Sequence, residues 1–480
     1  MKYETVIGLE VHAQMLTDSK IFCGCSTRFG SEPNTQTCPV CIGMPGVLPV
    51  LNKKTLEFTI KTGLATNCKI SSYSRFARKN YFYPDLPKGY QISQYELPIC
   101  EHGYVEIVVD ADIKRIGITR IHMEEDAGKN IHESASGGAG NYSFVDLNRA
   151  GVPLMEIVSE PDIRTPKEAA EYMKKLRAIM RCLGVCDGNM EQGSLRCDAN
   201  VSIRPVGQKE YGTRAEVKNI NSFKFVEKAL EYEIKRQIKV IEEGGKIIQE
   251  TRLWDSNKGI TESMRGKEEA HDYHYFPEPD LVPITVEQRW INEIKASLPE
   301  LPDIKRERFV SDYGLPEYDA DLLTEEKSTA EYFEEAVKLG GNPKIVANWI
   351  ITNIFKHLKE EDKEITEILF TPKHLVNLLS LIEVGSTSTT MAKTTILDEV
   401  FRSGKMPEVI VKEKGLVQIS DTSEIEKAVD EVIAKNHKEV ERFKAGDEKL
   451  LGFFVGQIMK LTKGKANPQI VNEIMKKKLT

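Results

Sequence analysis

Long apolar stretches are missing from this chain of 480 residues. No window approaches the roughly 18 uninterrupted apolar residues of a membrane span, and Glu4 and Glu10 lie where a signal peptide has its apolar run. The nine cysteines are too few for a disulfide scaffold, and their number is odd. A formal charge of −7 excludes a protein that coats nucleic acid through bulk positive charge. We therefore expect a cytoplasmic protein.

Several nucleotide-binding and hydrolase signatures are absent as well. The sequence has no G-x4-G-K-[ST] phosphate loop and no G-x-G-x-x-G after a predicted strand, so any ATP site is of another kind. It also lacks the G-x-S-x-G turn that carries the nucleophile of many hydrolases. The stretch 385–393 is rich in serine and threonine, but no base can be assigned to it, so we expect a polar loop there.

Segments in which apolar and polar residues alternate are frequent in the first 295 residues. This period of two is typical of a strand with one buried face. The clearest example runs over 194–204, and residues 3–15 and 115–123 are interpreted as strands on the same ground. Together they predict a mostly antiparallel sheet.

Helix signals occur between these strands. A helix is predicted over 165–182, where Thr165 is the N-cap and Pro166 the first helical residue. A second, long and charged helix is predicted over 223–243. Helices and a mostly antiparallel sheet in one region predict an α+β domain over 1–295.

From residue 296 the strand pattern fades and helix starts recur. Ser328 begins a predicted capping box, and Asn342 and Thr371 each precede a proline at a predicted helix start. We expect an all-helical domain over 296–405 and a helical tail domain over 406–480.

The tail is locally basic. From Lys449 onward it holds seven lysines and one glutamate, a charge of +6. Basic helices with Gly464 between them could contact the phosphates of an RNA backbone. A solvated, lysine-rich helix face explains the same residues, and the sequence leaves both interpretations open.

Carboxylates and histidines gather on the polar faces of the predicted strands. Glu10 shares a face with His12, and His122 shares one with Glu124. Further polar residues of these strands and their ends are Glu125, Asp126, Glu156, Glu191, Ser194, Arg196, Asp198, Glu216 and Lys218. If the strands are neighbours, they form one floor that suits Mg²⁺ or Mn²⁺, and such an ion could hold ATP phosphates. The alternative is a merely polar, exposed sheet face, against which the crowding of like charges weighs.

Four of the cysteines form a separate pattern. Cys23, Cys25, Cys38 and Cys41 follow the spacing C-x-C-x12-C-x-x-C. Two close pairs joined by a short loop match a tetrahedral zinc site, which has no open ligand position and is therefore structural. An iron–sulfur cluster and four unligated thiols are the alternatives. The other five cysteines are expected to be packing residues.

The segment 78–94 is dense in aromatic, proline and basic residues. Its two prolines exclude a regular helix. We interpret it as an ordered loop over a site, in which Arg78, Lys79 and Lys88 contact phosphate or RNA. An aromatic loop packed on its own domain is the alternative.

Eight motifs make the chain resemble the B-subunit family of the tRNA-dependent amidotransferases, GatCAB. They are ETVIGLEVH, RKNYFYPDLPKGYQISQ, HMEEDAGK, DLNRAGVPLMEIVSEPD, EQGSLRCDAN, EVKNINSF, DYHYFPEPDL and GQIMKLTKGKANPQIVNEI. The resemblance covers essentially the whole chain. It implies a cradle domain over 1–295, a helical domain over 296–405 and a tail domain similar to YqeY over 406–480, the latter two helping to bind tRNA.

The resemblance also implies a function. Members of this family use ATP and Mg²⁺ to phosphorylate the side-chain carboxylate of Glu on tRNA(Gln), or of Asp on tRNA(Asn), and ammonia then displaces the phosphate. The ammonia comes from a separate glutaminase A subunit, and a small C subunit holds the two together. The sequence itself shows no Ser-Ser-Lys machinery of an amidase. A non-catalytic tRNA-binding scaffold is the alternative function.

The family motifs imply the roles of individual residues. The implied metal ligands are Glu10, His12, Glu124 and Glu125. Lys79 is the implied phosphate contact and, with Arg196, the implied cofactor-binding pair. The residues implied to line the same pocket are Glu191, Ser194, Arg196 and Asp198. The four clustered cysteines are similar to a zinc site found in part of the family, so zinc is not expected to take part in the chemistry.

Overall fold

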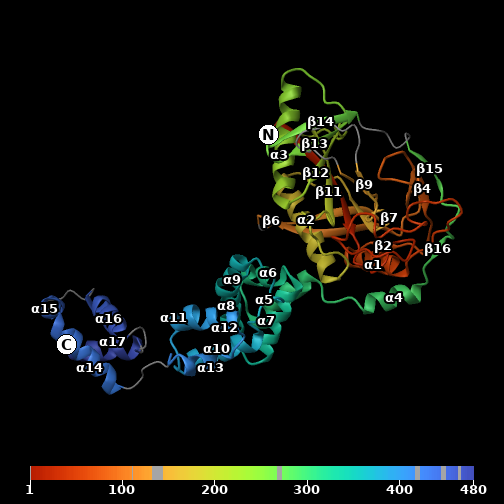
Figure 1. The fold of residues 1–480 in the computed structure, drawn as a ribbon. Helices are drawn as coiled ribbons and strands as arrows, with labels where there is room; N and C mark the ends of the chain where they lie inside the picture. The colour runs from red at the N-terminus through yellow and green to blue at the C-terminus, as the bar shows by residue number, and fades with distance from the viewer. Residues whose placement is uncertain are drawn as a thin grey trace, which may run out of the picture. The chain divides into compact units, whose positions relative to one another are not determined.

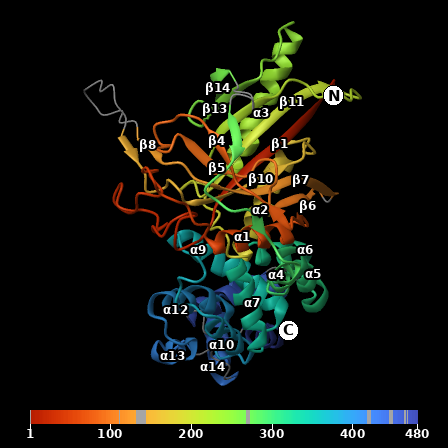
Figure 2. The ribbon, with the colours of Figure 1, turned by 90° about the vertical axis from the view of Figure 1, so that its right-hand side faces the viewer.

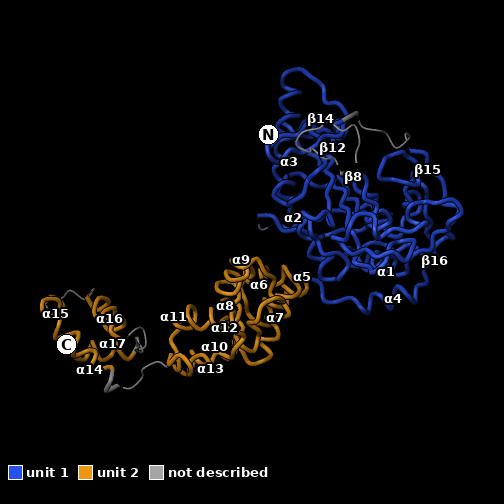
Figure 3. The backbone as a smooth tube through the Cα atoms, viewed as in Figure 1, with its two compact units in different colours: residues 1–302 blue, residues 303–480 orange. Residues whose placement is uncertain are grey.

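The computed structural model describes residues 2–110, 112–131, 144–266, 273–416, 422–444, 450–462, 466 and 468–479. They form two compact units, Met1–Pro302 and Asp303–Thr480 (Figure 3). None of the described helices is long and apolar enough to cross a membrane.

A nine-stranded sheet forms the centre of the first unit (Figure 1). In spatial order its strands are β14 (Ile260–Gly266), β13 (Glu250–Asp255), β12 (Ala215–Ile220), β11 (Leu195–Pro205), β1 (Tyr3–Gln14), β10 (Pro153–Ser159), β7 (Asp112–Glu125), β6 (Cys100–Val109) and β2 (Lys69–Ile70). Neighbours are antiparallel except β12 and β13, which are parallel. The predicted α+β class and mostly antiparallel sheet are confirmed.

The three strands predicted from alternation are all present. They correspond to β11, β1 and the longer β7. On β1, Leu9 and Val11 are buried in the core, whereas Glu10 and His12 lie on the opposite face and line a cavity. The alternation of the sequence therefore separates the core face of the sheet from the face that carries the polar side chains.

Helices pack against the core face of the sheet (Figure 2). They are α1 (Lys53–Ala65), α2 (Pro166–Cys182) and α3 (Phe223–Glu242), and α4 (Gln288–Ala296) packs on α1. As predicted, Thr165 is the N-cap of α2 and accepts a hydrogen bond from the Glu168 N–H at 3.2 Å. With the helices on one face, the polar side chains of the sheet gather on the other.

Short strands complete the first unit. A three-stranded sheet has the order β15 (His274–Pro277), β4 (Ala77–Asn80) and β5 (Tyr90–Ser93). The remaining pairs are β16 (Ile284–Thr285) with β3 (Tyr73–Ser74), and β8 (Lys129–Ile131) with β9 (Phe144–Asp146). The segment 78–94, predicted as a loop, therefore contains strand residues at both ends. These two strands, β4 and β5, pair with each other in antiparallel register, and β15 adds to β4 from far along the chain.

The second unit is helical. Its helices are α5 (Pro302–Tyr313), α6 (Glu317–Thr324), α7 (Lys327–Lys338), α8 (Pro343–Trp349), α9 (Phe355–Glu361), α10 (Pro372–Glu383), α11 (Thr389–Met391), α12 (Leu397–Ser403), α13 (Pro407–Glu413), α14 (Thr422–Lys435), α15 (His437–Lys444), α16 (Leu450–Leu461) and α17 (Pro468–Leu479). π-helical turns at Ile350–Ile354 and Ala392–Ile396 join α8 to α9 and α11 to α12.

Two of the three predicted helix starts in this unit are confirmed. Asn342 caps α8, and Thr371 forms a capping box with His374 at the start of α10. The capping box at Ser328 is wrong, because the chain already turns helical after Glu326, which places Ser328 inside the first turn of α7. The polar loop predicted at 385–393 is confirmed only over 385–388, because α11 begins at Thr389 and a π-helical turn follows it.

Each part of the chain has its own hydrophobic core. One core fills the first unit, and the second unit holds two separate buried clusters, one between Phe309 and Val411 and one between Ile425 and Leu479. The division into three domains with boundaries at 295 and 405 stays a prediction. In the basic tail, Lys449, Lys463, Gly464 and Lys465 lie outside the described residues.

Candidate active site

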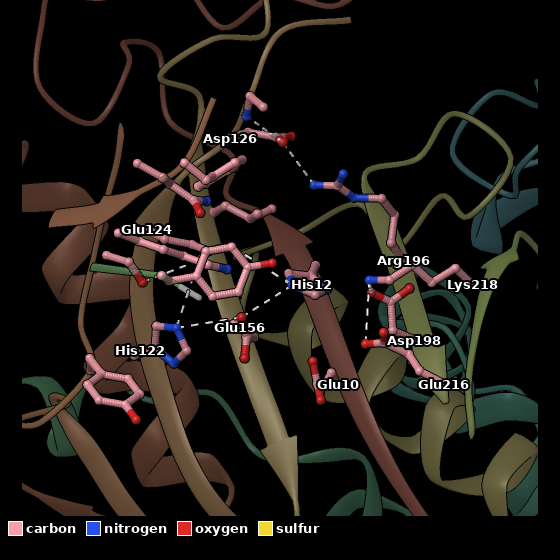
Figure 4. Close-up of a pocket in the computed structure, with 18 of the residues that line it drawn as sticks. Glu10, His12, His122, Glu124, Asp126, Glu156, Arg196, Asp198, Glu216 and Lys218 are labelled. Atoms are coloured by element: carbon pink, nitrogen blue, oxygen red, sulfur yellow. Dashed lines mark hydrogen bonds and ion pairs between the residues drawn. The ribbon is translucent and has the colours of Figure 1, made fainter. Parts of the chain in front are cut away.

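A row of polar side chains crosses four adjacent strands of the nine-stranded sheet. His12 of β1 lies opposite Glu156 of β10 and Arg196 of β11, and Glu156 lies opposite His122 of β7. Registered residues on neighbouring strands point to the same side of a sheet. All four line one cavity of about 820 Å³, and Figure 4 shows their side chains in it.

Glu156 lies between the two histidines. Its Oε2 is 3.3 Å from His12 Nε2 and 3.6 Å from His122 Nε2. Glu124, at the end of β7, places its Oε1 3.9 Å from His12 Nε2 and its Oε2 3.9 Å from His122 Nε2. One nitrogen of His12 and one oxygen of each glutamate lie within 4.8 Å of one another. We call His12, Glu124 and Glu156 the acid–histidine cluster.

Burial and close charges spread the pKa values of these groups. Burial lowers the pKa of His12, but its hydrogen bond to Glu156 and the nearby carboxylates outweigh burial and raise the pKa to about 9. Burial, with the charge of Glu156, raises the pKa of Glu124 to about 7. Burial alone would raise the pKa of Glu156, but the two histidines outweigh burial and hold this pKa below its usual range. For His122 burial prevails and lowers the pKa to about 4. At neutral pH a cationic His12 therefore lies among the carboxylates.

A second group of carboxylates lies over β1, β11 and β12. Glu10 is opposite Asp198, and the Lys218 ammonium is 2.6 Å from Asp198 Oδ2 and 3.6 Å from Glu216 Oε1. Asn200 donates a hydrogen bond to Glu10 at 2.8 Å. Burial and the neighbouring carboxylates raise the pKa of Glu10. Lys218 therefore offsets only part of the negative charge in this half of the cavity.

The two residues that the family motifs imply as the cofactor-binding pair, Lys79 and Arg196, both line the cavity. Arg196 donates to Asp126 Oδ1 at 3.0 Å, and this pair together with Arg149 keeps the pKa of Asp126 low despite its burial. The Lys79 ammonium lies 4.7 Å from the ring centre of Tyr273. The charge of Lys79 lowers the pKa of His122 and opposes the rise in the pKa of Glu124. The ammonium therefore lies close enough to act on the acid–histidine cluster.

Glu124 and Glu125 are neighbours on β7 and point to opposite sides of it. Glu124 lines the cavity and accepts a hydrogen bond from Ser93 at 3.3 Å. Glu125 accepts the Ile92 N–H at 2.8 Å and is ion-paired with Lys88, and both of these charged side chains are buried. Of the predicted metal ligands, the structure therefore brings Glu124 together with His12, whereas Glu10 lines the same cavity outside this cluster and Glu125 points away from it.

Glu191 and Ser194 do not line the cavity. Ser194 donates its hydroxyl to Asp187 and accepts the Asn189 N–H at 3.1 Å, and these bonds close the turn before β11. Glu191 is exposed in the same turn. Because β11 begins at Leu195, the alternation that places Arg196 and Asp198 in the cavity does not extend to these two residues.

Several cavity residues were not selected from the sequence. Glu156 and Glu216 were noted on polar strand faces, but their proximity to His12 and Asp198 depends on strand pairing that the sequence does not reveal. The cavity wall also carries Tyr81, Tyr95, Tyr273 and Tyr275. Tyr81 lies in the segment 78–94 that the sequence predicts over a site, whereas the other three are not predicted as site residues. The motif DYHYFPEPDL contained a signal for the last two, since it places tyrosines at alternating positions.

The four cysteines of the C-x-C-x12-C-x-x-C pattern converge at a separate place in the first unit. The sulfur atoms of Cys23, Cys25, Cys38 and Cys41 all lie within 4.8 Å of one another, and none is in a disulfide. The fully buried Lys20 places its ammonium 3.6 Å from Cys41 Sγ. A hydrogen bond with Cys23 and the charge of Lys20 lower the pKa of Cys41 to about 4. Four such sulfur ligands could hold one tetrahedral metal ion.

The acid–histidine cluster offers a different donor set. One imidazole nitrogen and two carboxylate oxygens are ligands that suit Mg²⁺ or Mn²⁺. A histidine ligand must be neutral, so a bound ion would take the place of the proton on His12. The residues fit a divalent cation because the carboxylates of Glu124 and Glu156 lie beside the protonated His12, whose place such an ion would take.

Comparison with known proteins shows the family of the chain. Residues 5–292 match the family model described as the GatB/GatE catalytic domain, and residues 331–479 match the GatB domain model. The B subunit of the aspartyl/glutamyl-tRNA(Asn/Gln) amidotransferase of Thermodesulfovibrio yellowstonii is 69% identical over 475 residues, which cover 99% of each chain. The protein of the same name from Geobacter sulfurreducens is 61% identical over 479 residues, all of both chains. The chain belongs to the family of B subunits of aspartyl/glutamyl-tRNA(Asn/Gln) amidotransferases.

Proposed function

We propose that the cavity on the nine-stranded sheet is where this chain activates and amidates the side chain of Glu or Asp carried by a tRNA, with ATP as the phosphoryl donor. The observation that carries the proposal is the acid–histidine cluster, whose three ligand atoms lie within 4.8 Å of one another on the floor of the cavity. A substrate carboxylate and a triphosphate both need positive charge beside them. An ion held by the cluster would supply it.

The chemistry explains why a phosphoryl donor is needed. A carboxylate reacts poorly with ammonia because the group expelled would be oxide. When a carboxylate oxygen attacks the γ-phosphorus of ATP, ADP leaves and an acyl phosphate forms. Ammonia then attacks the acyl carbon, phosphate leaves, and the nitrogen loses a proton to give the amide.

His12, Glu124 and Glu156 would hold Mg²⁺, which would neutralise charge on the phosphoryl oxygens during transfer. The side chains around them have supporting roles. Lys79 reaches toward the cluster from β4 and would contact phosphate, and Arg196 would do the same beside Asp126. Glu10 and Asp198 keep the other half of the cavity acidic, an environment that attracts ammonium over anions.

The remaining assignments are part of the same proposal. We assign zinc to the four clustered cysteines as a structural ion. A glutaminase A subunit would supply ammonia, and a small C subunit would complete the assembly. The helical and tail domains would bind tRNA, with lysines such as Lys460 and Lys476 on its backbone. The alternative of a non-catalytic scaffold is not favoured, because the family model matched by residues 5–292 is described as a catalytic domain.

The test measures phosphate released from ATP by the chain assembled with its A and C partners. With Glu-tRNA(Gln) and Mg²⁺ present, we expect release by the wild type that depends on the acylated tRNA. Glu156→Gln should lose it. Glu106→Gln is the matched control, because Glu106 is a half-exposed glutamate of β6 in the same sheet, outside the cavity. Equal release by all three proteins would refute the proposal.

A further inference from the structure

A pair of stacked tyrosines lies on the wall of the cavity. Tyr275 belongs to β15, and Tyr95 follows the end of β5. Their ring centres are 4.3 Å apart and their planes differ by 16°. Strand β4 lies between β15 and β5, so the ring of Tyr275 on β15 meets a ring from the chain that follows β5. Both rings line the cavity.

Tyr95 is the outer ring of this stack. Its side chain keeps 44% of its surface exposed although one ring face is covered by Tyr275. Within the parts of the chain that the structure describes, Tyr275 is the one ring partner of Tyr95, and the Tyr95 hydroxyl has no hydrogen-bond partner. A flat, half-exposed ring of this kind, backed by a second one, is a surface on which a nucleobase stacks.

The stack lies close to the reacting groups of the proposed function. Tyr275 pairs in register with Lys79 across β15 and β4, so both side chains are on the cavity side of the small sheet. Burial and then the charges of Glu124 and Glu156 raise the pKa of the Tyr275 phenol, which places it in the field of the acid–histidine cluster. A nucleotide whose base stacks here would have its phosphates, or the ester on its ribose, beside Lys79 and the acid–histidine cluster.

We infer that the Tyr95–Tyr275 stack binds an adenine base. The inference rests on the proposed function, which brings two adenosines to this cavity, one in ATP and one at the 3′ end of the acylated tRNA. Both present the same flat, electron-rich ring, and both carry the group that reacts. The acidic floor and the lysine at its edge suit such a polar ligand better than an aliphatic one.

The experiment measures equilibrium binding to the full chain assembled with its partners. The ligands are a non-hydrolysable ATP analogue with Mg²⁺, an uncharged tRNA(Gln), and the same tRNA without its terminal adenosine. Tyr95→Leu removes the ring and keeps an apolar side chain, whereas Tyr95→Phe keeps the ring. Tyr73→Leu is the control, because Tyr73 is 49% exposed and does not line the cavity.

We expect Tyr95→Leu to weaken one ligand roughly 5- to 150-fold, the range for one stacked base, and Tyr95→Phe to change binding less than about twofold. Loss confined to the ATP analogue assigns the stack to ATP. Loss confined to intact tRNA, with the truncated tRNA unaffected, assigns it to the terminal adenosine. Unchanged binding of both ligands overturns the inference, and so does equal weakening of intact and truncated tRNA. The proposed function survives either failure, because phosphate release depends on Glu156 and not on Tyr95.

Discussion

His12 on β1 and Glu156 on β10 lie opposite each other across an antiparallel strand pair, with Nε2 and Oε2 3.3 Å apart. Their contact makes His12 a cation at neutral pH and keeps Glu156 ionised. The same two residues also supply two of the three proposed ligand atoms of a metal ion. Protonation, stability and metal binding are therefore coupled at one point of the sheet.

The stability of the metal-free chain should depend on the proton of His12. Its pKa is raised from 6.5 to about 9 by folding, so the stabilisation is complete below pH 6.5 and is lost as the pH rises through about 9. The loss amounts to at most about 3 kcal/mol of the free energy of unfolding. Glu124, whose pKa is raised to about 7, acts in the same direction because its charged form is disfavoured in the fold.

Urea unfolding in a chelating buffer at pH 6.5 and pH 9 measures this loss. His12→Asn lacks the titrating group and should show a smaller fall in stability over the same interval. Parallel falls in the wild type and the variant would contradict the coupling.

Metal affinity should rise with pH. Because Mg²⁺ can bind only when His12 has lost its proton, the apparent affinity should increase about tenfold per pH unit below pH 9 and then level off. Calorimetric titration with Mg²⁺ at pH 7, 8 and 9 measures the slope, and the proton released is read from buffers of different ionisation enthalpy. An affinity that does not change over this interval would separate His12 from the metal.

The variants Glu124→Gln and Glu125→Gln should lose different properties, Mg²⁺ binding in the first and stability in the second. Glu124→Gln should abolish Mg²⁺ binding with little effect on stability, because its carboxylate is already disfavoured by burial and by Glu156. Glu125→Gln leaves the buried Lys88 without its partner, which costs about 3–5 kcal/mol in a buried pair, and should leave Mg²⁺ affinity within about twofold. Thermal unfolding and Mg²⁺ titration of both variants make the comparison. Loss of Mg²⁺ binding in a folded Glu125→Gln protein would contradict it.

Removal of the metal from the four cysteines should destabilise the fold without stopping the chemistry. A chelator or the substitution Cys38→Ser should lower the unfolding temperature. It should also reduce the zinc content to less than one ion per chain. Below the new unfolding temperature, the release of phosphate from ATP should stay within about threefold of the wild type, because no cysteine lines the cavity. Zinc analysis and the phosphate assay on the same samples test this prediction. Iron in place of zinc would favour the alternative of an iron–sulfur cluster.

Strand alternation in the sequence predicted which side chains of β1, β7 and β11 share the polar face. It placed Glu10, His12, Glu124 and Asp198 correctly with respect to the core, since a residue two positions along a strand returns to the same side. The same rule separates Glu124 from Glu125, but the family motif HMEED made both acids look equivalent.

The strand register was not accessible from the sequence. Glu156 meets His12 only because β10 pairs with β1 across some 140 intervening residues, and no local pattern encodes that pairing. The tyrosine wall depends on the same kind of contact between β15 and β4. The cysteine cluster is the opposite case, because two short spacings and one loop bring its ligands together with little help from the rest of the fold.

The most direct test of the acid–histidine cluster is the formation of Gln-tRNA with ammonia as the nitrogen source. The chain is assembled with its A and C partners and given Glu-tRNA(Gln), ATP, Mg²⁺ and ammonium chloride without glutamine, and the wild type is compared with Glu124→Gln and with the control Glu106→Gln. We predict a fall of at least about 100-fold in amide formed by Glu124→Gln, with tRNA binding unchanged and the control at the wild-type rate. Amide formation by Glu124→Gln at the wild-type rate would contradict the assignment of the chemistry to this cavity.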